Sequence, residues 1–206
     1  MLEHVPDWLG RALKGVRAGA DKLCIAEADL GSGFAAIRLH SPAFPDGGAI
    51  PARFTEDGEG VSPPLLWDAP PDGTACLALI VEDPDAPAPQ PLVHAIVWNI
   101  AADERALAEG AIRADGPTPT GRNSYFMTGW LPPDPPSGHG PHHYAFQLFA
   151  LASEPRLSGH PSRGQLVDAM RGDVLAAGLL TGTYSRGEPA RTGLAARVPA
   201  GARSPG

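Results

Sequence analysis

Three short apolar runs separated by turn residues dominate the middle of the chain. They span residues 74–81, 94–100 and 144–151. Nearly continuous apolar stretches of this length are typical of strands that are buried on both faces of a sheet. Turns rich in Pro and Gly punctuate the sequence, and no helical pattern lies between the first two runs. The pattern therefore predicts a mainly β fold, a sandwich rather than a parallel α/β sheet.

Apolar residues at helical spacing predict two helices outside these strands. In residues 1–24 the apolar positions recur every three or four residues with charged residues between them, which predicts an amphipathic N-terminal helix. That helix either covers its own domain or docks on a second copy of the chain, so a homodimer is open. Residues 162–180 place apolar side chains, among them Leu166 and Met170, at the same spacing and predict the second helix.

Length and composition set the predicted domain organisation. The 206 residues suffice for one domain, and 24 Pro and 25 Gly indicate a fold rich in turns. We predict an N-terminal helix over residues 1–24 and a β domain over 25–186. Residues 187–206 contain mainly Gly, Pro, Ala, Arg and Ser, which predicts a flexible tail.

Charge and cysteine content narrow the classes of partner and compartment. The net charge of −7 argues against nucleic-acid binding and against stable attachment to anionic membranes, because both use clusters of Lys and Arg. Cys24 and Cys76 form no disulfide framework and lack metal-ligand spacing, so we expect thiols in a reducing compartment. The first residues lack the apolar core of a secretory signal. A cytoplasmic protein is predicted.

Two turns that lead into strands carry the candidate chemistry. The first contains Asp83 and Asp85 and precedes His94; the second is rich in Gly and precedes His142 and Tyr144. His142 and Tyr144 are two residues apart, so they share one face of a strand. Two such loops at one end of a β-scaffold form a small pocket.

Hydrogen-bond donors dominate this predicted pocket, which favours an anionic ligand such as phosphate or a carboxylate. A carboxylate bonded to one imidazole nitrogen fixes the tautomer, and we expect Asp83 to orient a histidine in this way. The other ring nitrogen is then expected to face the ligand. Charge-assisted hydrogen bonds contribute about 1.5–3 kcal/mol each, so the expected affinity lies between micromolar and millimolar.

No catalytic motif accompanies these residues. The sequence contains no G-x-S-x-G elbow, no H-E-x-x-H, no P-loop and no Cys–His nucleophile pattern. We therefore predict a binding protein without enzymatic activity, without a metal site and without a cofactor. Two alternatives stay open: a kinase or protease inhibitor that acts by protein docking, and a weak hydrolase of phosphoesters or esters with His as base.

Several segments resemble the phosphatidylethanolamine-binding protein family, in particular its bacterial Raf-kinase-inhibitor-like branch. They are DPDAP with VHAIVWNI, PPSGHGPHHYAFQLFAL, SPAFPDGGAIP, SPPLLW and LLTGTYSR. The resemblance covers about residues 37–186. It implies a β-sandwich of two antiparallel sheets with a few peripheral helices. It also implies an anion pocket at one end that binds phosphate or a phosphorylated head group, with a regulatory role.

The resemblance assigns the pocket residues by motif position. The implied lining is Asp83, Pro87, His94, His142 and Tyr144, with Asp85 and Gly138 in support. It also implies a cis peptide bond between Ala86 and Pro87.

The sequence departs from the family pattern at three places. Ala95 stands where the family usually has Trp, Pro132 and Pro133 replace the usual Gly-Pro, and Asp134 occupies a position where Cys or Gly is common. An extra carboxylate and a stiffer backbone near the pocket mouth are expected to weaken anion binding or to alter its selectivity.

Overall fold

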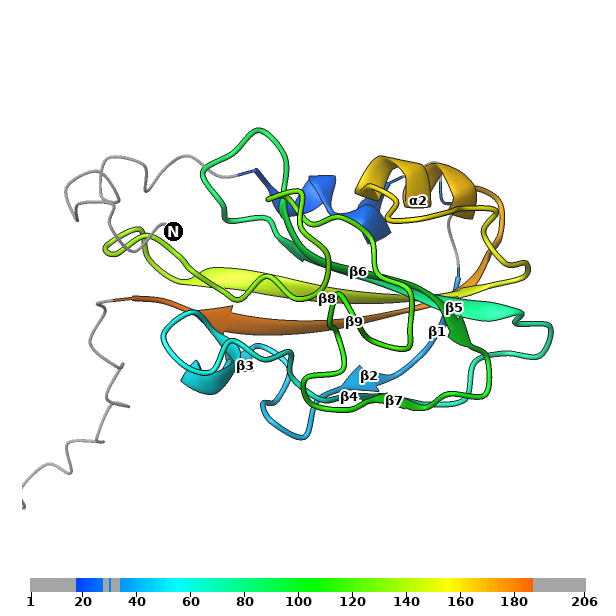
Figure 1. Ribbon diagram of the computed structural model, residues 1–206, viewed down its shortest axis with the longest axis horizontal. Helices are drawn as coiled ribbons and strands as arrows, with labels where there is room; N and C mark the ends of the chain where they lie inside the picture. Colours follow the sequence, from blue (N-terminus) through cyan, green and yellow to red (C-terminus); the bar gives the residue numbers. More distant parts are fainter. Residues whose placement is uncertain (1–17, 28–29, 31–33, 187–206) are drawn as a thin grey trace, which may run out of the picture.

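The computed structural model describes residues 18–27, 30 and 34–186. Two β-sheets packed face to face form the core of this part of the chain (Figure 1). The larger sheet has the order β1-β9-β8-β5-β6, with β3 also paired to β9. Its strands are β1 (Ala35–Ala36), β3 (Gly48–Ala49), β5 (Cys76–Asp83), β6 (Leu92–Ala101), β8 (His142–Leu151) and β9 (Val174–Tyr184). The smaller sheet comprises β2 (Leu39–His40), β4 (Leu65–Trp67) and β7 (Ala106–Leu107).

The predicted sandwich is confirmed, and the three apolar runs correspond to β5, β6 and β8. These central strands pair antiparallel, β5 with both β6 and β8, and β8 with β9. Parallel pairing occurs where the short strands β1 and β3 join β9. The antiparallel arrangement that the sequence predicts therefore holds for the long strands, while β9 also has parallel neighbours.

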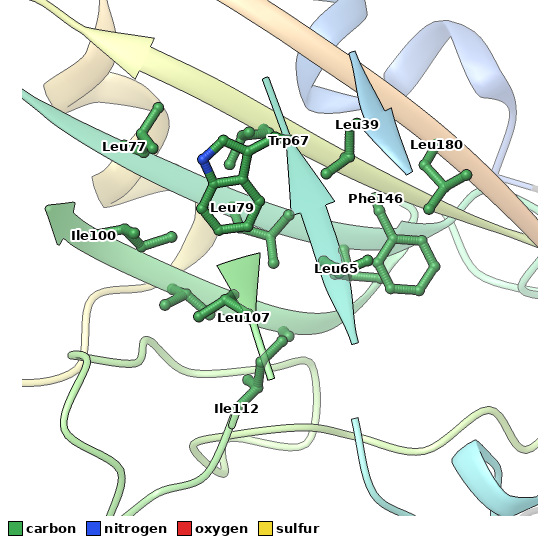
Figure 2. Close-up of a cluster of buried hydrophobic side chains, with 14 of the residues drawn as sticks. Leu39, Leu65, Trp67, Leu77, Leu79, Ile100, Leu107, Ile112, Phe146 and Leu180 are labelled. Carbon is green, nitrogen blue, oxygen red and sulfur yellow. The ribbon is translucent and has the colours of Figure 1, made fainter. Parts of the chain in front are cut away.

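Alternate residues of β5 point to opposite faces of the larger sheet, and both faces are buried. Leu77, Leu79 and Val81 point into the space between the two sheets, where the core cluster also includes Trp67 and Phe146. Figure 2 shows this cluster, with side chains from both sheets converging on it. Because water reaches neither face of β5, its sequence is continuously apolar until Glu82 and Asp83.

The outer face of the larger sheet is covered by helical segments, drawn above it in Figure 1. They are α2 (Arg163–Met170) and the 3-10 turns η1 (Ala20–Lys22) and η2 (Cys24–Ala26). A further 3-10 turn, η4 (Ala52–Phe54), belongs to the loop between β3 and β4. Ser162 and Gln165 form a capping box that fixes the start of α2.

A buried carboxylate fastens this cover to the sheet. Glu82 is fully buried, and its side chain accepts hydrogen bonds from the Cys24 backbone N–H and from the Gln147 amide. Arg163 Nε lies 2.5 Å from Glu82 Oε1 and Arg163 Nη1 lies 2.5 Å from Glu27 Oε1. The charge of Glu82 is therefore compensated, as burial of a carboxylate requires.

The predicted second helix is wrong in its C-terminal half. The α-helix ends at Met170, Gly172 adopts a φ of 74°, and residues 174–184 form β9. β9 pairs with nearly the whole length of β8, so its backbone groups are satisfied by the sheet. An apolar spacing that also fits a helix could not reveal this pairing, because the partner strand lies elsewhere in the sequence.

The predicted N-terminal helix and tail fall largely outside the described residues, which exclude 1–17 and 187–206. In the described part of the first segment, residues 20–22 and 24–26 form 3-10 turns rather than an α-helix. The division into three segments, the homodimer and the cytoplasmic location therefore stay predictions. Within the described residues, no helix has the length and apolar character needed to cross a membrane.

Both cysteines are buried free thiols, Cys24 in η2 of the cover and Cys76 at the start of β5. Burial raises the pKa of the Cys76 thiol to about 11 and raises that of Cys24 well above its ordinary value. The thiolate is the reactive form, so both side chains are poorly reactive at neutral pH.

Replacing Glu82 with Ala should destabilise the protein by about 3–5 kcal/mol, because it removes the buried member of an ion pair. The Cys24 N–H and the Gln147 amide then lose their acceptor, while Arg163 keeps Glu27 as a carboxylate partner. Amide exchange at residues 22–27 should also accelerate, since Glu82 holds the Cys24 N–H. Chemical denaturation and hydrogen exchange measure the two effects.

Glu59→Gln is the matched control for this variant. Glu59 also pairs with an arginine, but at 3.4 Å and at the surface, so its loss should change stability by less than about 1 kcal/mol. A Glu82→Ala protein as stable as Glu59→Gln would contradict the role assigned to Glu82.

Candidate functional site

A cavity of about 230 Å³ opens at the end of the sandwich where β5 ends and β8 begins. In Figure 1 this end of the larger sheet lies on the left. The walls come from the loop after β5, the start of β6, the segment that leads into β8, and two residues from other loops. The lining residues are Glu56, Asp83, Ala86, Pro87, Ala88, Leu92, His94, Tyr125, Leu131, Pro132, Asp134, Pro135, Pro136, His142 and Tyr144.

The cavity brings together five of the seven residues that the sequence singles out: Asp83, Pro87, His94, His142 and Tyr144. The other two lie outside the lining. Asp85 accepts a hydrogen bond from the His143 backbone N–H at 2.8 Å and contacts the exposed His143 ring at 2.6 Å. Gly138 has a φ of 76° and donates its N–H to the Arg186 carbonyl, so its role is to turn the backbone near the pocket.

Asp83 orients His142, as the sequence predicts. Asp83 Oδ2 lies 2.6 Å from His142 Nδ1, and Asp83 Oδ1 accepts the N–H of Asp85. The expectation that the second ring nitrogen faces the ligand is wrong for this histidine. His142 Nε2 lies 2.6 Å from Nδ1 of His139, which is also fully buried. Both ring nitrogens of His142 are therefore engaged by the protein, and its role is to hold the pocket wall.

A β-bulge aims His94 into the pocket. Val81 of β5 pairs with Ala95 and Glu82 pairs with Val93, so His94 is the extra residue on β6. Bulges commonly re-aim a side chain beside a functional site. His94 Nδ1 lies 2.7 Å from the Leu131 carbonyl, and the Leu131 N–H donates to the His94 carbonyl at 2.8 Å. The two contacts fix the ring between β6 and the loop.

Tyr144 lies against His94 in an edge-to-face arrangement, with 5.0 Å between the ring centroids. The Tyr144 hydroxyl and His94 Nε2 are buried and have no hydrogen-bond partner among the described residues. Burial raises the pKa of the Tyr144 phenol well above its ordinary value and lowers the pKa of His94. Both groups are thus uncharged at neutral pH, with polar atoms available to a ligand.

An arginine just after β9, Arg186, compensates the carboxylate of Asp134 at the pocket mouth. Arg186 Nη1 forms an ion pair with Asp134, and both side chains are nearly buried. Arg186 also contacts both carboxylate oxygens of Asp57 at 2.6–2.7 Å and thereby lowers the pKa of that carboxyl group. Asp134 therefore does not face the pocket as an isolated negative charge, which removes the physical reason for expecting it to weaken anion binding.

The structure also bears on two other expectations, the cis bond before Pro87 and the effect of Ala95. The described residues contain no cis peptide bond, so the predicted cis bond between Ala86 and Pro87 is wrong. Ala95, which replaces the usual Trp, is fully buried in the core between the sheets. Trp130 borders this region instead, stacked on Phe146 and tilted against His94.

The sequence interpretation missed several lining residues, among them Tyr125, Leu131 and Glu56. They come from loops without a pattern of their own, so no sequence signal assigns them to the pocket. Within the described residues, no group of three or more His, Cys, Asp or Glu side chains is arranged to hold a metal ion. His142 is instead hydrogen-bonded to His139 through Nε2 and to Asp83 through Nδ1.

Known proteins resemble this chain in sequence and in fold. The family model for phosphatidylethanolamine-binding protein matches residues 40–185. A UPF0098 protein of Methanothermobacter thermautotrophicus is 40% identical over 154 residues, which cover 73% of this chain and all of the relative. The solved structure of CT736 from Chlamydia trachomatis, a homologue of that family, has a TM-score of 0.68 at 35% identity and covers 73% of this chain and 98% of its own. The solved structure of YbcL from E. coli has a TM-score of 0.69 at 28% identity. The match covers 73% of this chain and 99% of YbcL.

Arg186→Gln should destabilise the protein by about 1.5–3 kcal/mol, because hydrogen bonds between charged groups at the pocket mouth are lost and Asp134 stays behind with its charge. Adding Asp134→Asn should recover part of the loss, since the stranded charge is then gone. Chemical denaturation of both variants measures this. A double variant less stable than Arg186→Gln alone would contradict the pairing.

Stability should fall as the pH drops below about 6.5, the ordinary His pKa, because the unfolded chain then binds a proton at His94 that the folded protein resists. The folded-state pKa is the lowered one, so the stability contribution is complete above pH 6.5 and is lost toward acid. One such proton changes the unfolding free energy by at most about 1.4 kcal/mol per pH unit. Denaturation between pH 7.5 and 5.5 should show a shallower slope for His94→Gln than for the parent; equal slopes would contradict the assignment.

Proposed function

The chain belongs to the phosphatidylethanolamine-binding protein family, and from this premise we propose that its pocket binds the phosphate group of a small anionic ligand without converting it. The observation that carries the proposal is the pair of buried polar atoms, His94 Nε2 and the Tyr144 hydroxyl, at the pocket. Buried polar groups are nearly always hydrogen-bonded, so two adjacent exceptions in one cavity favour a ligand site.

The size of the cavity supports a small ligand. Pockets for drug-sized molecules occupy roughly 300–1,000 Å³. The volume of about 230 Å³ found here lies below that range and suits a phosphate group with a short substituent. Pro87, Pro132 and Leu131 contribute apolar walls, which strengthen the few polar contacts by excluding water.

Charge at the pocket is more balanced than the acidic lining suggests. Asp83 is paired with His142, and Asp134 is paired with Arg186. Asp134 is therefore compensated by a cation, and Asp83 is held by a hydrogen bond from an imidazole, so a ligand with one negative charge meets less repulsion than these two carboxylates would impose unpaired. Glu56 is the third carboxylate of the lining.

The chemistry of the lining favours binding over covalent catalysis. Among the described lining residues there is no Ser, Thr, Cys or Lys that would serve as a nucleophile, and burial keeps the Tyr144 phenol protonated. His142 has both ring nitrogens engaged by the protein, so it is poorly placed to transfer a proton to a ligand. These features support a non-enzymatic role.

Inorganic phosphate and phosphoethanolamine should bind at pH 6 with dissociation constants between micromolar and millimolar. Tyr144→Phe should weaken both by roughly three- to tenfold, because one hydrogen bond of about 0.5–1.5 kcal/mol is lost while the ring remains. Isothermal titration, with NMR titration for the weaker complexes, measures the constants.

His143→Gln is the matched control, because His143 neighbours Tyr144 in sequence but is half-exposed and lies outside the cavity lining. Its affinity should equal that of the parent protein. Absence of binding to either probe, or equal weakening by both substitutions, would refute the proposed site.

A further inference from the structure

The hydrogen-bond geometry of His94 fixes which of its ring nitrogens carries hydrogen. A backbone carbonyl accepts hydrogen bonds and cannot donate them, so the 2.7 Å contact with Leu131 requires a hydrogen on His94 Nδ1. In the neutral imidazole, Nε2 is then a lone-pair acceptor. This is the atom that is buried without a partner among the described residues.

The surroundings of His94 keep the ring neutral. Desolvation lowers its pKa, and His142 acts in the same direction. Asp83, the hydrogen bond to the Leu131 carbonyl and Asp134 oppose the shift without reversing it. Asp134 is itself paired with Arg186, which limits its influence on the ring, and Asp83 is hydrogen-bonded to His142. Trp130 and Tyr144 contribute ring contacts rather than charge.

The Tyr144 hydroxyl supplies the complementary group. It stays protonated, so it can donate one hydrogen bond to a ligand oxygen. Together, the two side chains offer one acceptor and one donor at neighbouring positions. A fully deprotonated phosphate dianion satisfies the Tyr144 donor but sets a lone pair against the lone pair of His94 Nε2.

We propose that the His94–Tyr144 pair selects a phosphate monoester in its singly protonated form, with the P–OH group donating to His94 Nε2 and a P–O oxygen accepting from the Tyr144 hydroxyl. The inference rests on the proposed function and narrows it to one ligand class. A phosphodiester also carries a single negative charge but has no P–OH group, so it cannot make the first hydrogen bond. The site thus distinguishes a terminal phosphate from a bridging one.

Ethyl phosphate and dimethyl phosphate test this selection, because they contain the same number of heavy atoms and differ in the P–OH group. We expect ethyl phosphate to bind at least tenfold more tightly than dimethyl phosphate at pH 5.5 in NMR titrations. Above the second pKa of the monoester, about 6, its affinity should fall about tenfold per pH unit. Dimethyl phosphate should show no such fall.

The ring nitrogen signals of ¹⁵N-labelled His94 show directly which partner carries the proton. Nε2 should keep the chemical shift of an unprotonated nitrogen at pH 7, both free and with ethyl phosphate bound. Protonation of Nε2 on binding would overturn the inference, because the histidine and not the ligand would then be the donor. Equal affinity for the two esters, or affinity that rises above pH 7, would overturn it as well, while phosphate binding itself would stand.

His94→Gln is the informative variant, since its amide can donate as well as accept. It should bind the two esters within about threefold of each other, whereas the His143→Gln control should keep the parent preference. Should His94→Gln not fold, as judged by thermal denaturation, the ¹⁵N measurement on the parent protein decides. Failure of both esters to bind at any pH would instead refute the proposed function.

A terminal phosphate monoester occurs both in soluble metabolites and in lipids such as phosphatidic acid. Competition between ethyl phosphate and phosphatidylcholine vesicles that contain phosphatidic acid distinguishes the two sources. Displacement of ethyl phosphate by these vesicles, but not by pure phosphatidylcholine, would support selection of a lipid monoester; no displacement would support selection of a soluble one. Displacement by pure phosphatidylcholine, a diester, would overturn the inference.

Discussion

The antiparallel pairing of β5 with β8 is the constraint on which the rest of the structure depends. Its register places Glu82 opposite Ala145, so Asp83 emerges at the strand end where His142 and Tyr144 begin β8. Both strands are buried on both faces, and polar side chains are therefore tolerated only where each finds a partner. At the pocket, two buried polar atoms, His94 Nε2 and the Tyr144 hydroxyl, have no hydrogen-bond partner among the described residues.

Much of the fold could be predicted because burial on both faces leaves a plain signature in the sequence. The runs that correspond to β5, β6 and β8 are nearly continuously apolar, and no Asp, Glu, Lys or Arg interrupts them before the strand ends. The spacing predicts a helix up to residue 180, which includes the first part of β9, because small and apolar residues fit either period. Its identity is decided by the ladder with β8, a long-range interaction that local spacing does not encode.

The candidate site was predictable in its residue types and less so in their roles. Asp83, His94, His142 and Tyr144 stand at strand ends, and the strand period brings them to one region. The role of His142 depends on His139, and the neutralisation of Asp134 depends on Arg186, 52 residues away. The bulge at His94 is a change of register between β5 and β6, so the sequence of either strand alone does not reveal it.

Glu82 and Asp83 are sequence neighbours that serve opposite sides of one sheet, the first beneath the helical cover and the second at the pocket. A one-residue insertion or deletion within β5 would exchange their faces. The longer glutamate would then intrude on the cavity, and the shorter aspartate would stand opposite Arg163. We therefore expect length variation among relatives to concentrate in the connecting loops and to spare this strand, whatever ligand each of them has come to prefer.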